Sequence, residues 1–199
     1  MKIKVILIHA CFLLISLGIK YYQVDGPDLI WNMFLALVAY DFALLCTLAK
    51  TFSVTLLLAL AWLFFYPNTF YMLTDIVHMN FTSTVLWDQS SLILYFLFVA
   101  SILFGVMSGV ESVNLLFKRF SIDSYPLKLI LIGLLSFVSS FAIHIGRYAR
   151  LNSWDIIMRP KVVVVELINV WSWGAVYFVL GFTLLQIVTL LFAVSESKS

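Results

Sequence analysis

The sequence predicts an all-α fold: a polytopic integral membrane protein, with six transmembrane helices in a bundle and short interfacial helices on one face. The first observation is composition, because 63% of the residues are hydrophobic, 11% are charged and the mean hydropathy is +1.07, whereas soluble domains are nearer half apolar. The second is that the apolar residues form six stretches, and a bilayer core needs about 20 mainly apolar residues per helix. Few residues are left over, so we expect one domain, residues 1–199.

Short polar breaks separate the predicted spans, which cover residues 3–20, 29–49, 51–66, 91–117, 126–146 and 168–194. The first break holds no small-x-small motif, so we expect an uncleaved first span and not a signal peptide. Only Ala49-Lys50-Thr51 separates the second span from the third, which predicts a tight helical hairpin. Pro126 suits the first turn of the fifth helix.

An even number of spans places both termini on one side of the membrane. If that side is the cytoplasm, the inner segments hold seven Lys and Arg residues and the outer segments hold five. The positive-inside rule favours this orientation, so we expect a multi-pass protein of the cell (plasma) membrane with cytoplasmic termini. In either orientation the loops 20–30, 67–90 and 147–167 share one face, because each follows an odd-numbered span.

Composition also bounds the partners. A formal net charge of +2 is too small to argue for nucleic acid. Cys11 and Cys46 lie in apolar spans and form no Cys-x-x-Cys pair, which indicates buried free thiols and not a disulfide or a thiolate metal site. We expect no cofactor and no metal, with the lipid bilayer as the partner that the composition requires.

The first polar cluster follows the third span and runs from Tyr66-Pro67-Asn68 to Thr74-Asp75-Ile76-Val77-His78. Asp75 and His78 are three residues apart, so on a helical turn both point the same way. That spacing suits a general acid/base pair or two ligands of a metal. The alternative is an interfacial helix that places Tyr71, Met72 and Ile76 among the lipid headgroups, with its polar face in water.

The second polar cluster follows the fifth span and runs from Gly146-Arg147 to Trp154-Asp155. His144, Arg147 and Arg150 recur at three-residue spacing. Arginine presents a planar fork matched to phosphate or carboxylate, so this stripe suits a lipid headgroup or an anionic substrate. The alternative is that the two arginines anchor the helix at the interface, or pair internally. We predict at least one hydrogen bond between Arg147 or Arg150 and Asp75 or Asp155.

The run Asn152-Ser153-Trp154-Asp155 is typical of a helix start, because Asn or Ser can cap the first free amides and Asp favours the positive end of the helix dipole. The short helix would end before Pro160, with Trp154 at interface depth. The predicted catalytic residues are Asp75, His78 and Asp155, and the predicted substrate-binding residues are Asn68, His144, Arg147, Arg150, Asn152 and Trp154.

Two features lie inside the spans. Asp41 is costly to bury in lipid, and counting from the helix ends places it at the depth of His9 on the neighbouring antiparallel span, so we expect a hydrogen bond between them. Ser101, Gly105 and Gly109 form a small-xxx-small stripe in the fourth span. Such a stripe is a close helix-packing surface, either inside the chain or with a second copy or another membrane protein.

Three motifs together resemble those of a bacterial six-span family that is catalogued only as a domain of unknown function. They are Trp31-Asn32-x-Phe34-Leu35-Ala36, then Trp62-Leu63-Phe64-x-x-Pro67-Asn68-x-x-Tyr71-x-x-Thr74-Asp75-x-x-His78, and finally Gly146-Arg147-x-x-Arg150-x-Asn152-Ser153-Trp154-Asp155. The resemblance covers most of the chain, and it implies the six-span topology and a bacterial cell membrane. It implies no activity. One departure is Ala39, where the pattern leads us to expect proline.

Three functions compete on the sequence alone. The first is an outward-facing polar pocket that binds or processes an anionic, lipid-linked substrate, with Arg147 and Arg150 holding the anion and Asp75 and His78 moving protons. The second is a non-enzymatic subunit that stabilises or regulates a membrane partner. The third is a small transporter. The sequence has no internal repeat and few charges at the membrane midplane, and both observations count against it.

Overall fold

The computed structural model describes residues 2–81, 88–148, 158–169 and 173–194, and every secondary-structure element in these ranges is helical. The elements are α1 (Lys2–Tyr21), α2 (Leu29–Leu48), α3 (Phe52–Phe65), α4 (Pro67–Tyr71), the 3₁₀ helix η1 (Met72–Phe81), α5 (Gln89–Arg119), α6 (Tyr125–Tyr148), α8 (Pro160–Asn169) and α9 (Trp173–Ala193). Six helical segments are long and apolar enough to cross a membrane. The predicted all-α polytopic fold is therefore confirmed.

The third span continues past its predicted end at residue 66, and the apolar segment runs from Phe52 to Met79. Pro67 begins α4 and lacks an N–H, yet Tyr66 keeps helical dihedral angles (φ −52°, ψ −42°). The Asn68 side-chain amide donates to the Phe65 carbonyl over 3.0 Å. This bond supplies a donor where the backbone hydrogen bonds of the helix are interrupted at Pro67. The first part of the predicted connection 67–90 is thus helical, formed by α4 and η1, with an interruption at Met79 (φ −77°, ψ 23°).

The connection before the last span also differs from the prediction. Within the predicted loop 147–167 the structure forms α8, and Pro160 is its first residue, where a missing N–H is tolerated. The last span begins at Gly174 and not at residue 168. The short helix predicted to end before Pro160 falls on residues 149–157, which lie outside the described residues.

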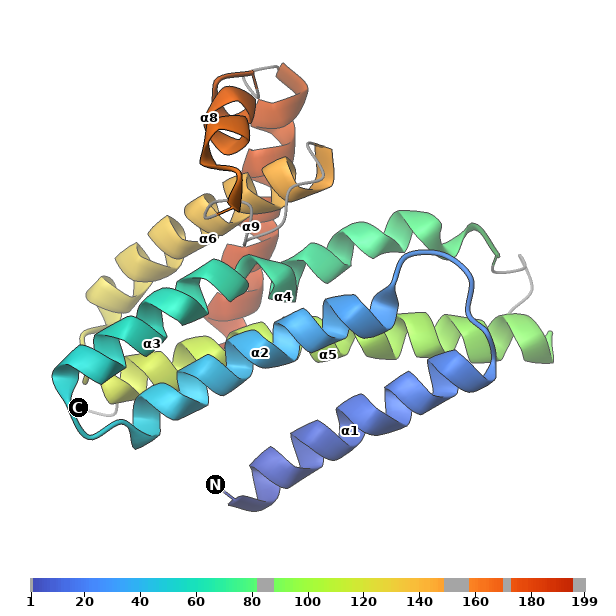
Figure 1. Cartoon of the computed structure of the whole chain (residues 1–199), viewed down its shortest axis with the longest axis horizontal. Coiled ribbons are helices and arrows are strands. Elements are labelled where there is room, and N and C mark those ends of the chain that lie inside the picture. Colours follow the sequence, from blue (N-terminus) through green and yellow to red (C-terminus); the bar gives the residue numbers. More distant parts are fainter. Residues whose placement is uncertain (1, 82–87, 149–157, 170–172, 195–199) are drawn as a thin grey trace.

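Helix α2 is central, in contact with α3, α4 and α5, and α6 pairs with α9 (Figure 1). Ala36, Ala39 and Ala43 are fully buried on one face of α2, and their small side chains allow neighbouring backbones to approach closely. Where the resemblance led us to expect proline, Ala39 lies inside one continuous helix. Helix α4 contacts α2, α5 and α6, so it joins the two groups of helices.

The small-residue stripe of α5 packs inside the chain. Ser101, Gly105 and Gly109 are buried, and a methyl group built on Gly105 would lie 3.0 Å from the Thr69 carbonyl oxygen of α4. The structure therefore shows the internal one of the two predicted alternatives. A homodimer through this stripe would first have to displace α4 and η1.

Arg119, at the end of α5, fastens the α2–α3 hairpin. Its Nε donates to the Cys46 carbonyl over 2.7 Å, and its Nη2 donates to the Ala49 carbonyl over 3.0 Å and to Thr55 Oγ1 over 2.8 Å. The two carbonyls lie at the end of α2, where they have no partner within the helix and where a cation is favourable, and Thr55 belongs to α3. One guanidinium thus holds the tight hairpin that residues 49–51 predicted.

Arg119→Ala is expected to lower the free energy of unfolding by about 1.5–3 kcal/mol, the usual contribution of hydrogen bonds to a charged group. Arg119→Lys should recover little, because an ammonium does not reproduce the three-way geometry. Lys118→Ala is the control, since Lys118 is the exposed neighbour. Thermal unfolding in lipid nanodiscs measures all three. Equal midpoints for the Arg119 and Lys118 variants would contradict the anchoring role.

Candidate functional site

The site is built around Asp75, whose side chain is fully buried (0% exposed) on η1. Asn32, in the first turns of α2, donates its side-chain amide to Asp75 Oδ2 over 2.9 Å. The start of α2 fixes the place of Asn32, because Asp28 caps the helix by accepting from the Trp31 N–H at 2.9 Å. The carboxyl is therefore held by a helix that lies 43 positions earlier in the chain.

The other oxygen of Asp75, Oδ1, is buried and receives no hydrogen bond from the described residues, and the same holds for the hydroxyl of Thr74 beside it. Burying a polar atom without a hydrogen-bond partner costs free energy, and the cost is larger for a carboxylate oxygen than for most polar atoms. Asp75 Oδ1 is thus an acceptor that a proton or a donor group of a bound molecule can satisfy.

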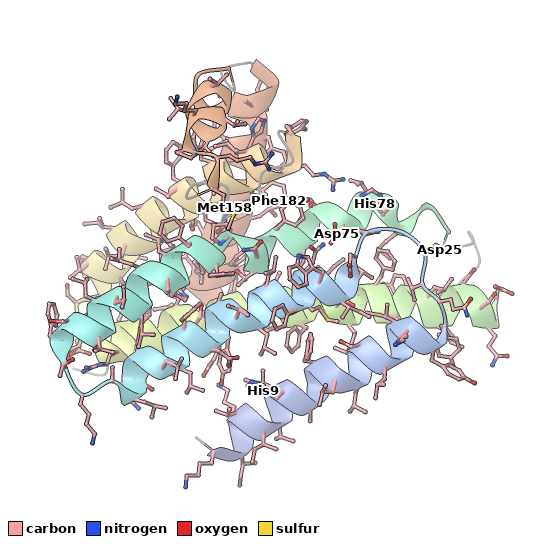
Figure 2. The ribbon with its side chains drawn as sticks, viewed as in Figure 1. His9, Asp25, Asp75, His78, Met158 and Phe182 are labelled. Carbon is pink, nitrogen blue, oxygen red and sulfur yellow. The ribbon has the colours of Figure 1, made fainter. Side chains whose placement is uncertain are left out.

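Arg147, near the end of α6, reaches His78 on η1, with 3.0 Å between Nη2 and the imidazole Nε2. Arginine is always protonated and can only donate, so His78 Nε2 must accept, which makes His78 a neutral imidazole with its hydrogen on Nδ1. Arg147 is also close enough for its positive charge to act on Asp75. Figure 2 shows Asp75 and His78 on η1, beside the start of α2 and away from His9 on α1.

This geometry changes the predicted pairing. Of the four pairings that would satisfy the prediction, the one between Arg147 and Asp75 is not formed, because Arg147 binds His78 and Asp75 accepts from Asn32. The pairs that involve Arg150 or Asp155 lie outside the described residues. The prediction that the two polar clusters lie on one face and meet is confirmed by the bond between Arg147 and His78.

The remaining predicted residues have other surroundings. His144 is buried between aromatic rings, stacked on Tyr148 with centroids 4.5 Å apart and edge-on to Phe178 of α9 at 5.2 Å. The amide of Asn68 serves the kink at Pro67 by binding the Phe65 carbonyl. Asn152 and Trp154 lie outside the described residues. Within the described part of the chain neither His144 nor Asn68 bonds Asp75, since Oδ2 accepts from Asn32 and Oδ1 has no partner.

The metal alternative gains no further ligand from the structure. Among the described residues, no group of three or more His, Cys, Asp or Glu side chains is placed to hold a metal ion. Of the three side chains that the interfacial-helix alternative places among the headgroups, Ile76 is exposed on η1, Tyr71 is partly buried and Met72 is fully buried.

Sequence reasoning missed two polar side chains, Asn32 in the site and Gln186 outside it. Asn32 stands in one of the resemblance motifs but received no role, although it is a polar residue early in an apolar span, on the face that carries Asp75. Gln186 of α9 is fully buried and donates to Ser140 Oγ over 2.8 Å and to the Ser136 carbonyl over 3.3 Å, both on α6. A polar amide inside an apolar run is the signal that could have revealed each of them.

The fold and the site define a multi-pass α-helical membrane protein with a buried carboxyl–amide pair and an arginine–imidazole pair at one end of its bundle. The chain belongs to the family described as "Protein of unknown function (DUF1361)", whose model matches residues 31–189. The matched region begins at α2 and includes Asn32, Asp75, His78 and Arg147, but not α1. No curated protein and no solved structure matches the chain.

Proposed function

We propose that this protein binds, and processes by proton transfer, an anionic lipid-linked molecule at the Arg147–His78–Asp75 site. The observation that carries the proposal is that the partner of Arg147 is a neutral imidazole and not a carboxylate. Its positive charge is therefore not cancelled by a direct partner among the described residues. A guanidinium has five N–H donors, and the bond to His78 uses one, so an anion can be bound by the same fork.

Proton transfer is supported by the positions of two groups. An anion that binds the Arg147 guanidinium in place of His78 leaves Nε2 of His78 free to accept a proton. Asp75 Oδ1 is a second acceptor and is already without a donor among the described residues. A proton leaving the bound molecule can thus go to His78 or to Asp75, which is the arrangement of a general base.

The lipid-linked character of the ligand rests on what surrounds the site. Ile76 and Val77, between Asp75 and His78, are 50% and 62% exposed on η1. Tyr148, next to Arg147, is 67% exposed at the end of α6. In a membrane these apolar and aromatic side chains lie against acyl chains and at the headgroup level. A molecule with a charged head and an apolar tail matches both parts of this surface.

We further propose that the membrane is the bacterial plasma membrane and that both termini are cytoplasmic. The support is the excess of Lys and Arg in the segments on the terminal side, seven against five. In this orientation the site faces outward.

The alternative function is a non-enzymatic subunit that stabilises a membrane partner. It is favoured by the fact that the same two bonds tie η1 to α2 and to α6, which is also what a purely structural network would do.

The test is native mass spectrometry of the protein after exchange into nanodiscs of phosphatidylglycerol or phosphatidylcholine. We expect the wild-type chain to retain phosphatidylglycerol in preference, and Arg147→Gln to lose most of that preference, about tenfold or more if a charge-assisted contact is worth roughly 1.5–3 kcal/mol. Lys20→Gln is the matched control, because Lys20 is an exposed cation at the same end of the bundle. Equal loss in both variants would contradict a specific anion site. Loss of folded protein in step with loss of lipid would favour the subunit alternative.

A further inference from the structure

A second ionisable cluster lies outside this site, where the first half of α1 meets α2 and α5. His9 of α1 is 3.4 Å from Asp41 of α2, between Nε2 and Oδ1, which confirms the pair expected from sequence depth. Lys4 of α1 and Glu111 of α5 form an ion pair of 2.6 Å. The ring of Tyr40 is 6.5 Å from that of His9.

The cluster lies inside the bilayer. His9 is seven residues from Lys2 at the start of α1, and Asp41 is seven residues from Leu48 at the end of α2. At about 1.5 Å per residue, both are roughly 10 Å from the helix ends. The pair is 40% and 38% exposed on the surface of the chain, which at this depth is a surface turned toward lipid.

The hydrogen bonds of His9 fix its tautomer. The Nδ1 atom is 2.9 Å from the Val5 carbonyl, and a carbonyl only accepts, so Nδ1 must carry a hydrogen. The second ring nitrogen, Nε2, faces a carboxyl oxygen. Without a further proton, a nitrogen lone pair would point at a carboxylate and leave an uncompensated charge in apolar surroundings.

We propose that His9 and Asp41 form an intramembrane proton-binding site that takes up one proton between Nε2 and Oδ1, and that this proton fastens the first half of α1 to α2. With the proton in place the pair is an imidazolium with a carboxylate, or an imidazole with a carboxylic acid. Either form has one hydrogen bond and no net charge.

The neighbouring charges cancel, so the net charge of the cluster depends on the His9–Asp41 pair. On α1 itself the facing charge is Lys4, on α5 it is Glu111, and these two neutralise one another. On α2 the facing titratable group is the Tyr40 phenol, which is neutral near pH 7. Release of the proton therefore changes the net charge of the cluster from zero to minus one.

Attachment of α1 depends on these polar contacts at one end only. The second half of α1 packs Phe12, Ile15 and Ile19 in an apolar cluster with residues of α2 and α5. In the first half, Ile3, Ile6 and Leu7 are exposed, so the contacts of Lys4 and His9 hold this half. Loss of the proton turns one of the two attractions into a repulsion.

The site is tested by nitrogen NMR of ring-labelled histidine in nanodiscs, with His9→Gln identifying the His9 signals among those of the three histidines. We expect Nδ1 to be protonated throughout, and Nε2 to exchange one proton with pH in the wild-type chain. Asp41→Asn should shift that titration by at least one pH unit, whereas Glu111→Gln should leave the tautomer unchanged. A bare Nδ1 in the wild-type chain, or an unchanged titration in Asp41→Asn, would overturn the site. The tautomer is read from the wild-type chain once His9→Gln has identified the signals, so it does not depend on the folding of Asp41→Asn or Glu111→Gln.

The fastening step is tested with spin labels on Cys11 and on Met107→Cys of α5, in a chain that carries Cys46→Ser. Both positions are exposed. The distance distribution should broaden above the midpoint found by NMR. In Asp41→Asn the distance distribution should be the same on both sides of that midpoint, because the Asn amide donates to Nε2 of His9 and has no proton to lose. The same narrow distribution on both sides of the midpoint in the wild-type chain would refute the fastening role.

Discussion

Asn32→Asp is expected to be the most damaging conservative substitution near the site. It would place a second carboxyl at the 2.9 Å contact with Asp75, which is fully buried. Two ionised carboxylates in such a position are destabilising by several kcal/mol, and the variant should therefore yield little folded protein at neutral pH. Lowering the pH should restore it in part, because two carboxyls that share one proton carry a single negative charge.

The matched control is a double variant that carries both Asn32→Asp and Asp75→Asn. One amide and one carboxyl still face each other, so the thermal midpoint should return to near the wild-type value. The carboxyl would then project from α2 and not from η1. A single Asn32→Asp variant as stable as the wild type at pH 7 would show that this bond does not hold Asp75.

Gly109→Leu is expected to force α4 away from α5. A methyl group at Gly109 would already lie 2.9 Å from Thr69 Cβ and 3.1 Å from a ring carbon of Phe70. Overpacking of this kind typically costs about 1–3 kcal/mol, and a leucine adds three more carbons than a methyl, so we expect the upper end or beyond. Because α4 leads directly into η1, the same variant should also lose the retention of phosphatidylglycerol.

Gly133→Leu on α6 is the comparison, since nothing lies within 4 Å of a methyl group built there. It should leave the thermal midpoint within a few degrees of the wild type. Both glycines are in helices, so the intrinsic gain from replacing glycine is similar. Equal stability of the two variants would contradict the close contact between α4 and α5.

Much of the fold could be predicted because an apolar run of about 20 residues is a signal that needs no knowledge of the partner helices. The hairpin at residues 49–51 and the pair of His9 with Asp41 followed from the spacing and depth of the spans. The end of the third span was wrong for a local reason. The predicted span ends at residue 66, but Pro67 is the first residue of the next helix, and the Asn68 side chain supports the junction.

The sequence predicts which residues of the site lie near one another, but not which atoms form the hydrogen bonds. That Asp75, His78 and Arg147 lie at one end of the bundle follows from topology. Which atom binds which depends on how far each helix is rotated about its own axis, and the sequence pattern does not determine that rotation. A sequence argument pairs opposite charges, so it offered Asp75 and Asp155 as the partners of Arg147 and Arg150. In the structure, Asn32 from α2 takes the carboxyl and His78 takes the guanidinium.

The two anchoring contacts of α5 have a consequence for the order of biosynthesis. Glu111 is translated 107 residues after Lys4, its ion-pair partner, and Arg119 is translated 73 residues after Cys46, whose carbonyl it binds. A ribosome therefore delivers α1, α2 and α3 to the membrane before the side chains that satisfy them exist. Until α5 emerges, the nascent chain holds an unpaired cation and open carbonyls at the end of a hairpin. The insertion of α5 is therefore the step that pairs the Lys4 cation and supplies a donor to the open carbonyls of the hairpin.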